Sequence, residues 1–191
     1  MSQSLREKRR RELERERRQR RLMIGGAVVV VVLVVGFFIY RATQQQIDGL
    51  QTFDNLDRGH AVNVSIPDTG LPPAGGTHNP QWLNCGIYDQ PVETTQAIHS
   101  MEHGAVWLAY TPDLSAEEIA TVESYAEGDG FVLVSPYPGL VSDVVATAWG
   151  AQIQVDELPD DRIDRFIARF RGQGPEAGAT CSGGVGAPRT G

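Results

Sequence analysis

Basic residues are scarce in the larger part of this chain. After Arg41 only six arginines stand against twenty Asp or Glu residues, which leaves an excess of fourteen negative charges. Such an acidic surface repels the phosphate backbone, so we exclude nucleic acid as a partner of this part of the chain. No internal repeat is visible, and the stretch from Ile47 to Arg171 is long enough for one domain with its own core.

Charge is missing altogether from residues 22–40, LMIGGAVVVVVLVVGFFIY. At a helical rise of about 1.5 Å per residue, this run spans about 28 Å, which matches the hydrocarbon core of a bilayer. A cleavable signal peptide is the competing interpretation. The run is longer than the roughly 7 to 15 apolar residues of such a peptide, and residues 41–46 offer no small-x-small cleavage site. We therefore predict an uncleaved transmembrane helix over 22–40.

The segment before this helix is strongly basic, with ten Lys or Arg residues against four Glu in residues 1–21. Because cytoplasmic flanks carry the excess of basic residues, we expect a single-pass protein of the plasma membrane with a cytoplasmic N-terminus and an extracytoplasmic C-terminal part. Anionic lipid headgroups are the expected partner of the basic segment. The predicted organisation is a basic tail (1–21), a transmembrane helix (22–40), a stalk (41–57), a globular domain (58–175) and a Gly-rich tail (176–191).

The globular part mixes strand and helix patterns without a regular βαβ repeat, which predicts an α+β fold. We expect a mixed or antiparallel sheet of three to five strands and about three helices. The S-x-x-E pattern of Ser115 and Glu118 marks one helix start. The expected strands are 60–66, 105–110, 131–137 and 144–150, the expected helices are 93–103, 115–128 and 160–171, and a Gly- and Pro-rich loop occupies 67–91.

The densest group of reactive side chains is HSMEHG at residues 99–104. On a helix, His99, Glu102 and His103 share one face. On a strand, His99, Met101 and His103 would share a face instead and form a copper-like ligand set. Gly104 sits where a glycine commonly ends a helix, so the helical arrangement is favoured.

His60 and His78 complete the histidines of the chain, and all four lie within 44 positions. Their grouping predicts a metal site of His60, His78, His99 and His103 that binds Zn²⁺, or Cu if Met101 takes part. Two alternatives stay open. The H-x-x-E-H pattern also fits a hydrolase in which Glu102 activates water, and Cys85 is a second candidate nucleophile. Histidines at a helix end can instead bond to backbone carbonyls in an interaction or structural module without metal.

Cys85 and Cys181 are the two cysteines, and both fall on the expected extracytoplasmic side. Disulfides persist in that compartment. We predict a Cys85–Cys181 bridge that ties down the Gly-rich tail.

Several of these pieces, read in order, resemble the family known as domain of unknown function 3105. They are GHAVNV, LPPAGGTHNPQWLNCGIYDQPV, AIHSMEHGAVWLAYTPDL, LVSPYPGL, AWG and GPEAGATC, and together they cover about residues 58–188. The resemblance implies one N-terminal membrane anchor with an outward domain. It also implies that His78, His99, Glu102 and His103 belong to one set of motifs. It supplies no reaction and no protein partner.

Overall fold

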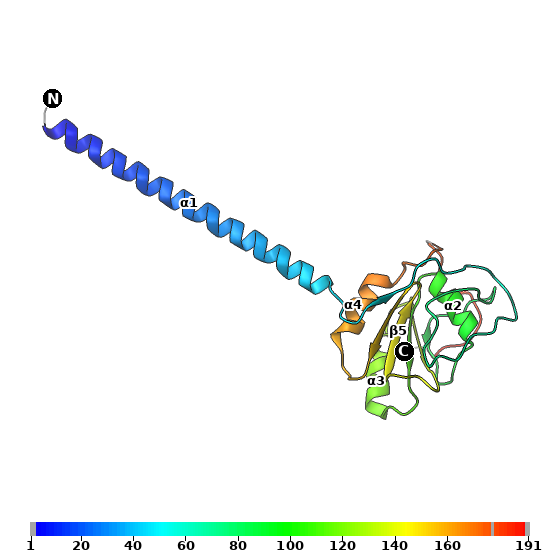
Figure 1. Ribbon diagram of the computed structural model, residues 1–191. Helices are drawn as coiled ribbons and strands as arrows, with labels where there is room; N and C mark the ends of the chain where they lie inside the picture. Colours follow the sequence, from blue (N-terminus) through cyan, green and yellow to red (C-terminus); the bar gives the residue numbers. More distant parts are fainter. Residues whose placement is uncertain (1–2, 177, 190–191) are drawn as a thin grey trace. The chain divides into compact units, whose positions relative to one another are not determined.

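The computed structural model describes residues 3–176 and 178–189, and the chain divides into two compact units between Gln46 and Ile47. The first unit is a single helix, α1 (Gln3–Gln45) (Figure 1). Its segment Arg17–Phe38 is long and apolar enough to cross a membrane by length and composition, two criteria that a signal sequence also meets. This segment contains most of the apolar run predicted to span the bilayer.

The second unit begins at Ile47, well before the domain boundary expected at residue 58. Ile47 is buried in the core, and Leu50 packs against it. Strand β1 (Gln51–Thr52) pairs with β6 (Ala151–Val155) in antiparallel orientation. Residues 47–57 of the segment expected to be a stalk therefore belong to the second unit, whereas residues 41–46 belong to the first.

The second unit is built on a six-stranded mixed sheet with the order β1-β6-β5-β3-β4-β2. Strand β3 lies near the middle, parallel to β4 and antiparallel to β5. The predicted α+β class is confirmed, with one strand more than the upper limit expected. The remaining strands are β2 (Gly86–Ile87), β3 (Val106–Tyr110), β4 (Val132–Pro136) and β5 (Val144–Ala148).

One predicted strand is wrong and three strands were not expected. Residues 60–66 form only an isolated bridge between His60 and His78, and Val62 in this segment is 70 % exposed. An apolar alternation forms a strand only where a neighbouring strand is available to pair with it, and residues 61–66 have no strand partner among the described residues, although Ile66 packs against the second hydrophobic cluster. The unexpected strands β1 and β2 span two residues each and carry too little pattern to detect, while β6 has the sequence AQIQV with two Gln residues.

The side chains of β3 alternate between two hydrophobic clusters. Val106 and Leu108 belong to the cluster on one face of the sheet, whereas Trp107 and Ala109 belong to the cluster on the other. Such two-sided burial is possible because successive side chains of a strand point to opposite faces. Helices α3 (Ala116–Ser124) and α4 (Asp161–Phe170) cover the first face, and α2 (Thr94–Glu102) lies against the second (Figure 1).

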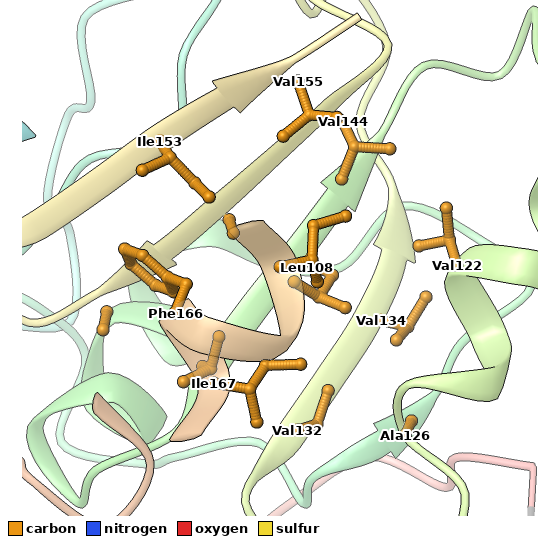
Figure 2. Packing of buried hydrophobic residues seen from close by; sticks show 14 of the residues in the cluster. Leu108, Val122, Ala126, Val132, Val134, Val144, Ile153, Val155, Phe166 and Ile167 are labelled. Atoms are coloured by element: carbon orange, nitrogen blue, oxygen red, sulfur yellow. The ribbon is translucent and has the colours of Figure 1, made fainter. Parts of the chain in front are cut away.

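The first cluster contains the apolar stripe that the sequence predicts for α4. Ile163, Phe166 and Ile167 are buried against the sheet, and Figure 2 shows the last two over the strand side chains, with Val122 and Ala126 from the α3 side. The predicted capping box of α3 is present, because the Ser115 and Glu118 side chains each bond to the other residue's backbone N–H. The sequence patterns therefore located these helices correctly.

A C-terminal strap, formed by residues 172–176 and 178–181, crosses the end of α2. Gly172 N–H donates to the Gly104 carbonyl at 2.8 Å, and Glu176 N–H donates to the Glu102 carbonyl at 3.1 Å. A Cβ atom at Gly174 would lie 2.0 Å from the Glu102 carbonyl oxygen, so only glycine permits this crossing. Beyond the crossing, the Sγ atoms of Cys181 and Cys85 lie 1.99 Å apart, at bonding distance.

A matched pair of valine substitutions tests the assignment of the core. Val134 lies on β4 and is fully buried in the first hydrophobic cluster, whereas Val62 is 70 % exposed. We expect Val134→Ala to lower the free energy of unfolding by about 2 kcal/mol, because it removes buried methyl groups and leaves a cavity. Val62→Ala should change it by less than about 0.5 kcal/mol. Urea unfolding followed by tryptophan fluorescence measures both values, and equal losses would contradict the assignment.

Candidate metal centre

Three of the histidines come together from three separate segments of the chain. His99 lies on α2, while His60 and His78 lie on loops joined by a short bridge, in which Ala61 N–H donates to the His78 carbonyl at 2.8 Å and His78 N–H donates to the Gly59 carbonyl at 2.9 Å. The ring centroids of His60 and His78 are 4.6 Å apart, and each lies 4.8 Å from the ring of His99. The bridge thus holds both loop histidines over the helix.

Backbone carbonyls fix the rings of the three buried histidines. Nδ1 of His78 lies 2.7 Å from the Gly76 carbonyl, Nδ1 of His99 lies 2.7 Å from the Asn79 carbonyl, and Nδ1 of His103 lies 2.9 Å from the Thr180 carbonyl. A carbonyl only accepts, so each Nδ1 carries the hydrogen and donates it. In the neutral ring, Nε2 then carries a lone pair. This is the arrangement by which proteins orient metal-binding histidines.

Glu102 lies among these lone pairs and is almost completely buried. Its Oε2 atom is 3.0 Å from Nε2 of His78 and 3.7 Å from Nε2 of His60, while its Oε1 atom is 3.9 Å from Nε of Arg58. Within the described part of the chain, neither Nε2 of His78 nor Oε2 of Glu102 has a hydrogen-bond partner. With a neutral His78 ring, whose hydrogen is on Nδ1, these two atoms are acceptors that face each other. Burying such groups unsatisfied is unfavourable, and a cation between them would satisfy both.

The candidate ligands form two overlapping sets, in each of which one ligand atom per residue lies within 4.8 Å of all the others. We name them after their carboxylates. The Glu102 group consists of His60, His78, His99 and Glu102, and the Glu176 group consists of His99, His103 and Glu176. In the second group, Nε2 of His103 lies 3.1 Å from Oε2 of Glu176. The domain thus contains a buried histidine–glutamate group that can hold a metal ion.

The structure distributes the predicted site residues differently from the single set expected. His60, His78 and His99 meet as predicted, but His103 lies in the Glu176 group. Glu102 lies among the candidate ligands, whereas the sequence suggested it as a base beside the ion. Met101 is fully buried in the second hydrophobic cluster, so the helical arrangement is confirmed and the thioether points away from the histidines.

Glu176 is the candidate ligand that the sequence analysis missed. It lies in GPEAGATC, between Gly174 and Cys181, where no spacing relates it to the histidines. The strap carries it to the end of α2, and the predicted pairing of Cys181 with Cys85 is the feature of the sequence that points to this return.

Two tryptophan rings lie beside the histidines. Trp82 lies 4.7 Å from the ring of His103 and 5.6 Å from that of His99, and Trp149 lies 5.7 Å from the ring of His78. These rings limit access of water to the buried nitrogens. The side chain of His60 remains 39 % exposed, which leaves one open side.

The pKa of His99 is lowered to about 4 from its ordinary value of 6.5, mainly by burial and to a smaller extent by the neighbouring His78, His103 and His60. The hydrogen bond to the Asn79 carbonyl acts in the opposite direction. His99 is therefore neutral at neutral pH and able to bind a metal.

The fold and the site define a class: an α+β domain, in a chain with one apolar N-terminal helix, that carries a buried histidine–glutamate group. The family described as "Protein of unknown function (DUF3105)" matches residues 60–183, and the chain belongs to this family. The match includes every residue of both ligand groups. No curated protein and no solved structure matches the chain.

The lowered pKa of His99 predicts how stability depends on pH when metal is removed with a chelator. Between pH 6.5 and about 4 the unfolded chain takes up a proton at His99 that the folded chain does not. The free energy of unfolding should therefore fall as the pH is lowered through this window, with no further loss from His99 below it. Urea unfolding at several pH values measures the slope. His99→Gln should make it shallower, and equal slopes in the two proteins would contradict the assignment.

Proposed function

We propose that this chain is a single-pass membrane protein whose extracytoplasmic domain binds a transition-metal ion in the Glu102 group. The observation that carries the proposal is the contact of 3.0 Å between Nε2 of His78 and Oε2 of Glu102, both buried and both without a hydrogen-bond partner among the described residues. The hydrogen on Nδ1 of His78 is committed to the Gly76 carbonyl. A bound cation is the simplest group that stabilises the two facing acceptors.

Zn²⁺ is the ion that the donors suit best. Three imidazole nitrogens and one carboxylate make a four-coordinate set of the kind that Zn²⁺ takes in proteins. In a tetrahedral site with bonds of about 2.0 to 2.1 Å, neighbouring ligand atoms lie about 3.3 Å apart. The contacts of Glu102 with His78 and His60, at 3.0 and 3.7 Å, lie on either side of that value. The soft thioether of Met101, which would favour Cu(I), is buried in the core.

Binding without catalysis agrees with the surroundings of the site. Four protein ligands would close the coordination shell and leave no position for substrate. A cavity of about 520 Å³ lies along the neighbouring loop, and its lining includes Gly76 and Thr77 but none of the candidate ligands. A structural module without metal accounts for the carbonyl partners of the three Nδ1 atoms. In such a module, the contact between His78 and Glu102 would have to be an ion pair of a doubly protonated, fully buried His78 with the carboxylate.

Metal titration of the purified full chain tests the Glu102 group. After removal of metal with a chelator, the protein should bind Zn²⁺ and gain thermal stability, because the ion binds the folded state alone. Glu102→Gln and His78→Ala should each weaken binding by more than about 100-fold, since loss of a direct ligand should cost at least as much as loss of a ligand's hydrogen-bond partner.

The matched control for this titration is Glu157→Gln, which removes the same charge from an exposed position. It should bind Zn²⁺ like the unaltered protein. Tryptophan fluorescence of each variant checks that the domain remains folded. Absence of Zn²⁺, Cu²⁺ and Co²⁺ binding by the unaltered chain would end the proposal.

The membrane topology follows from the charges around α1. The segment Arg17–Phe38 can span a bilayer, and residues 1–21 contain ten basic residues. By the positive-inside rule, the basic residues 1–21 would lie on the cytoplasmic side, where they would contact anionic lipid headgroups. The domain from Ile47 onward would then lie outside, in a compartment where a Cys85–Cys181 disulfide persists.

A reporter fused after Gly191 tests this topology. An enzyme that is active only outside the cytoplasm, such as a disulfide-dependent phosphatase, should be active at this position, and a cytoplasm-dependent fluorescent protein should be dark. The opposite result would reverse the orientation. Release of the domain in soluble form, without the apolar segment, would show that the segment is a cleaved signal peptide.

A further inference from the structure

His103 and Glu176 remain a second pair of facing groups once the Glu102 group is filled. Nε2 of His103 lies 3.1 Å from Oε2 of Glu176, and Nδ1 of His103 faces the Thr180 carbonyl at 2.9 Å. The geometry repeats that of His78 and Glu102, with the hydrogen of one ring nitrogen committed to a carbonyl and the other nitrogen turned to a carboxylate. One ion in the Glu102 group leaves this second pair without a metal.

His99 stands between the two groups and belongs to both. Its ring centroid is 4.8 Å from those of His60, His78 and His103 alike. Its Nδ1 is taken by the Asn79 carbonyl, so only the Nε2 lone pair is free to bind an ion. One lone pair binds one ion, and His99 must therefore belong to one group at a time.

We propose that the domain holds a second divalent transition-metal ion in the Glu176 group, adjacent to the first. This inference rests on the proposed function. When His99 turns to the second ion, the six ligands divide into two sets of two histidines and one carboxylate: His60, His78 and Glu102 for one ion, and His99, His103 and Glu176 for the other. Each set has the composition of the 2-His-1-carboxylate triad, which leaves open positions on its metal.

The two ions bind with different strength. The first can use all four ligands of the Glu102 group, whereas the second takes His99 from it and is repelled by the charge already present. A solvent oxygen between the ions, as in two-metal sites with ions about 3.5 to 4 Å apart, compensates part of this cost. The side chain of Glu176 is 45 % exposed, so the second ion enters from solvent.

The second position depends on the C-terminal strap. The strap supplies both Glu176 and the Thr180 carbonyl that orients His103, and Cys181 holds its end against Cys85. The ligands of the Glu102 group and the carbonyls of Gly76 and Asn79 come from residues 60–102 instead. Loss of the cysteine pair should therefore remove the second ion and spare the first.

Titration of the full chain with Zn²⁺ against a chromophoric chelator tests the inference. We expect two equivalents, the second bound at least about tenfold more weakly. Glu176→Gln should bind one equivalent, with the affinity of the first changed by less than about threefold. The control Glu157→Gln should bind two. The double variant Cys85→Ser/Cys181→Ser should bind one, and two equivalents in it would overturn the dependence on the strap.

Electron paramagnetic resonance with Cu²⁺ tests whether the ions are neighbours. The signal of the first equivalent should broaden and lose intensity when the second binds, because two Cu²⁺ ions about 4 Å apart couple magnetically. Two additive, independent signals would overturn the inference. So would two Zn²⁺ equivalents in Glu176→Gln, or a single equivalent bound equally by that variant and the unaltered chain. This last result leaves the proposed function intact, whereas absence of any binding by the unaltered chain would end both proposals.

Discussion

The turn at Gly104 is the constraint on which the rest of the domain depends. With a φ of 99°, Gly104 ends α2 and leads within two residues into β3, the strand buried on both faces. Ala105 N–H donates to the Ser100 carbonyl at 2.9 Å, so helix and strand are joined by a tight turn. A side chain at Gly104 would also meet the backbone of Gly172 at 2.7 Å, which would displace the strap. One glycine thus connects the core, the histidine helix and the C-terminal segment.

This turn sets the orientation of α2, and the orientation separates its residues by chemistry. Ile98 and Met101 point into the second hydrophobic cluster, while His99, Glu102 and His103 meet the loops and the strap. Carbonyls of the loops and of the strap accept from Nδ1 of His78, His99 and His103 and so orient these three rings. The site is therefore rich in buried acceptors and poor in buried donors. A polar group of this composition is unfavourable in an apolar interior unless a cation balances it.

Local patterns predicted the parts of the fold that depend on neighbours in sequence. The capping box at Ser115, the apolar stripe of α4 and the glycine after His103 each act within a few residues, and the structure contains all three. The alternation in residues 60–66 misled because a strand needs a partner strand, and within the described residues this segment pairs only through the isolated bridge between His60 and His78. The two Gln residues of β6 concealed a strand that is buried in the sheet. Ala151, Ile153 and Val155 pack in the first cluster, and Gln152 on the other face is also buried and donates to the Pro72 carbonyl.

By itself, the sequence determined the apolar helix, the α+β class and the helical face shared by His99, Glu102 and His103, because helical periodicity and charge are local properties. Only the tertiary structure decided which groups meet that face. His60 and His78 reach it through a bridge between loops, and Glu176 reaches it on the strap, more than seventy residues further along the chain. Contacts between distant segments follow from packing and chain crossing, which leave no spacing in the sequence. The division of the histidines into a Glu102 group and a Glu176 group therefore became visible only in the folded domain.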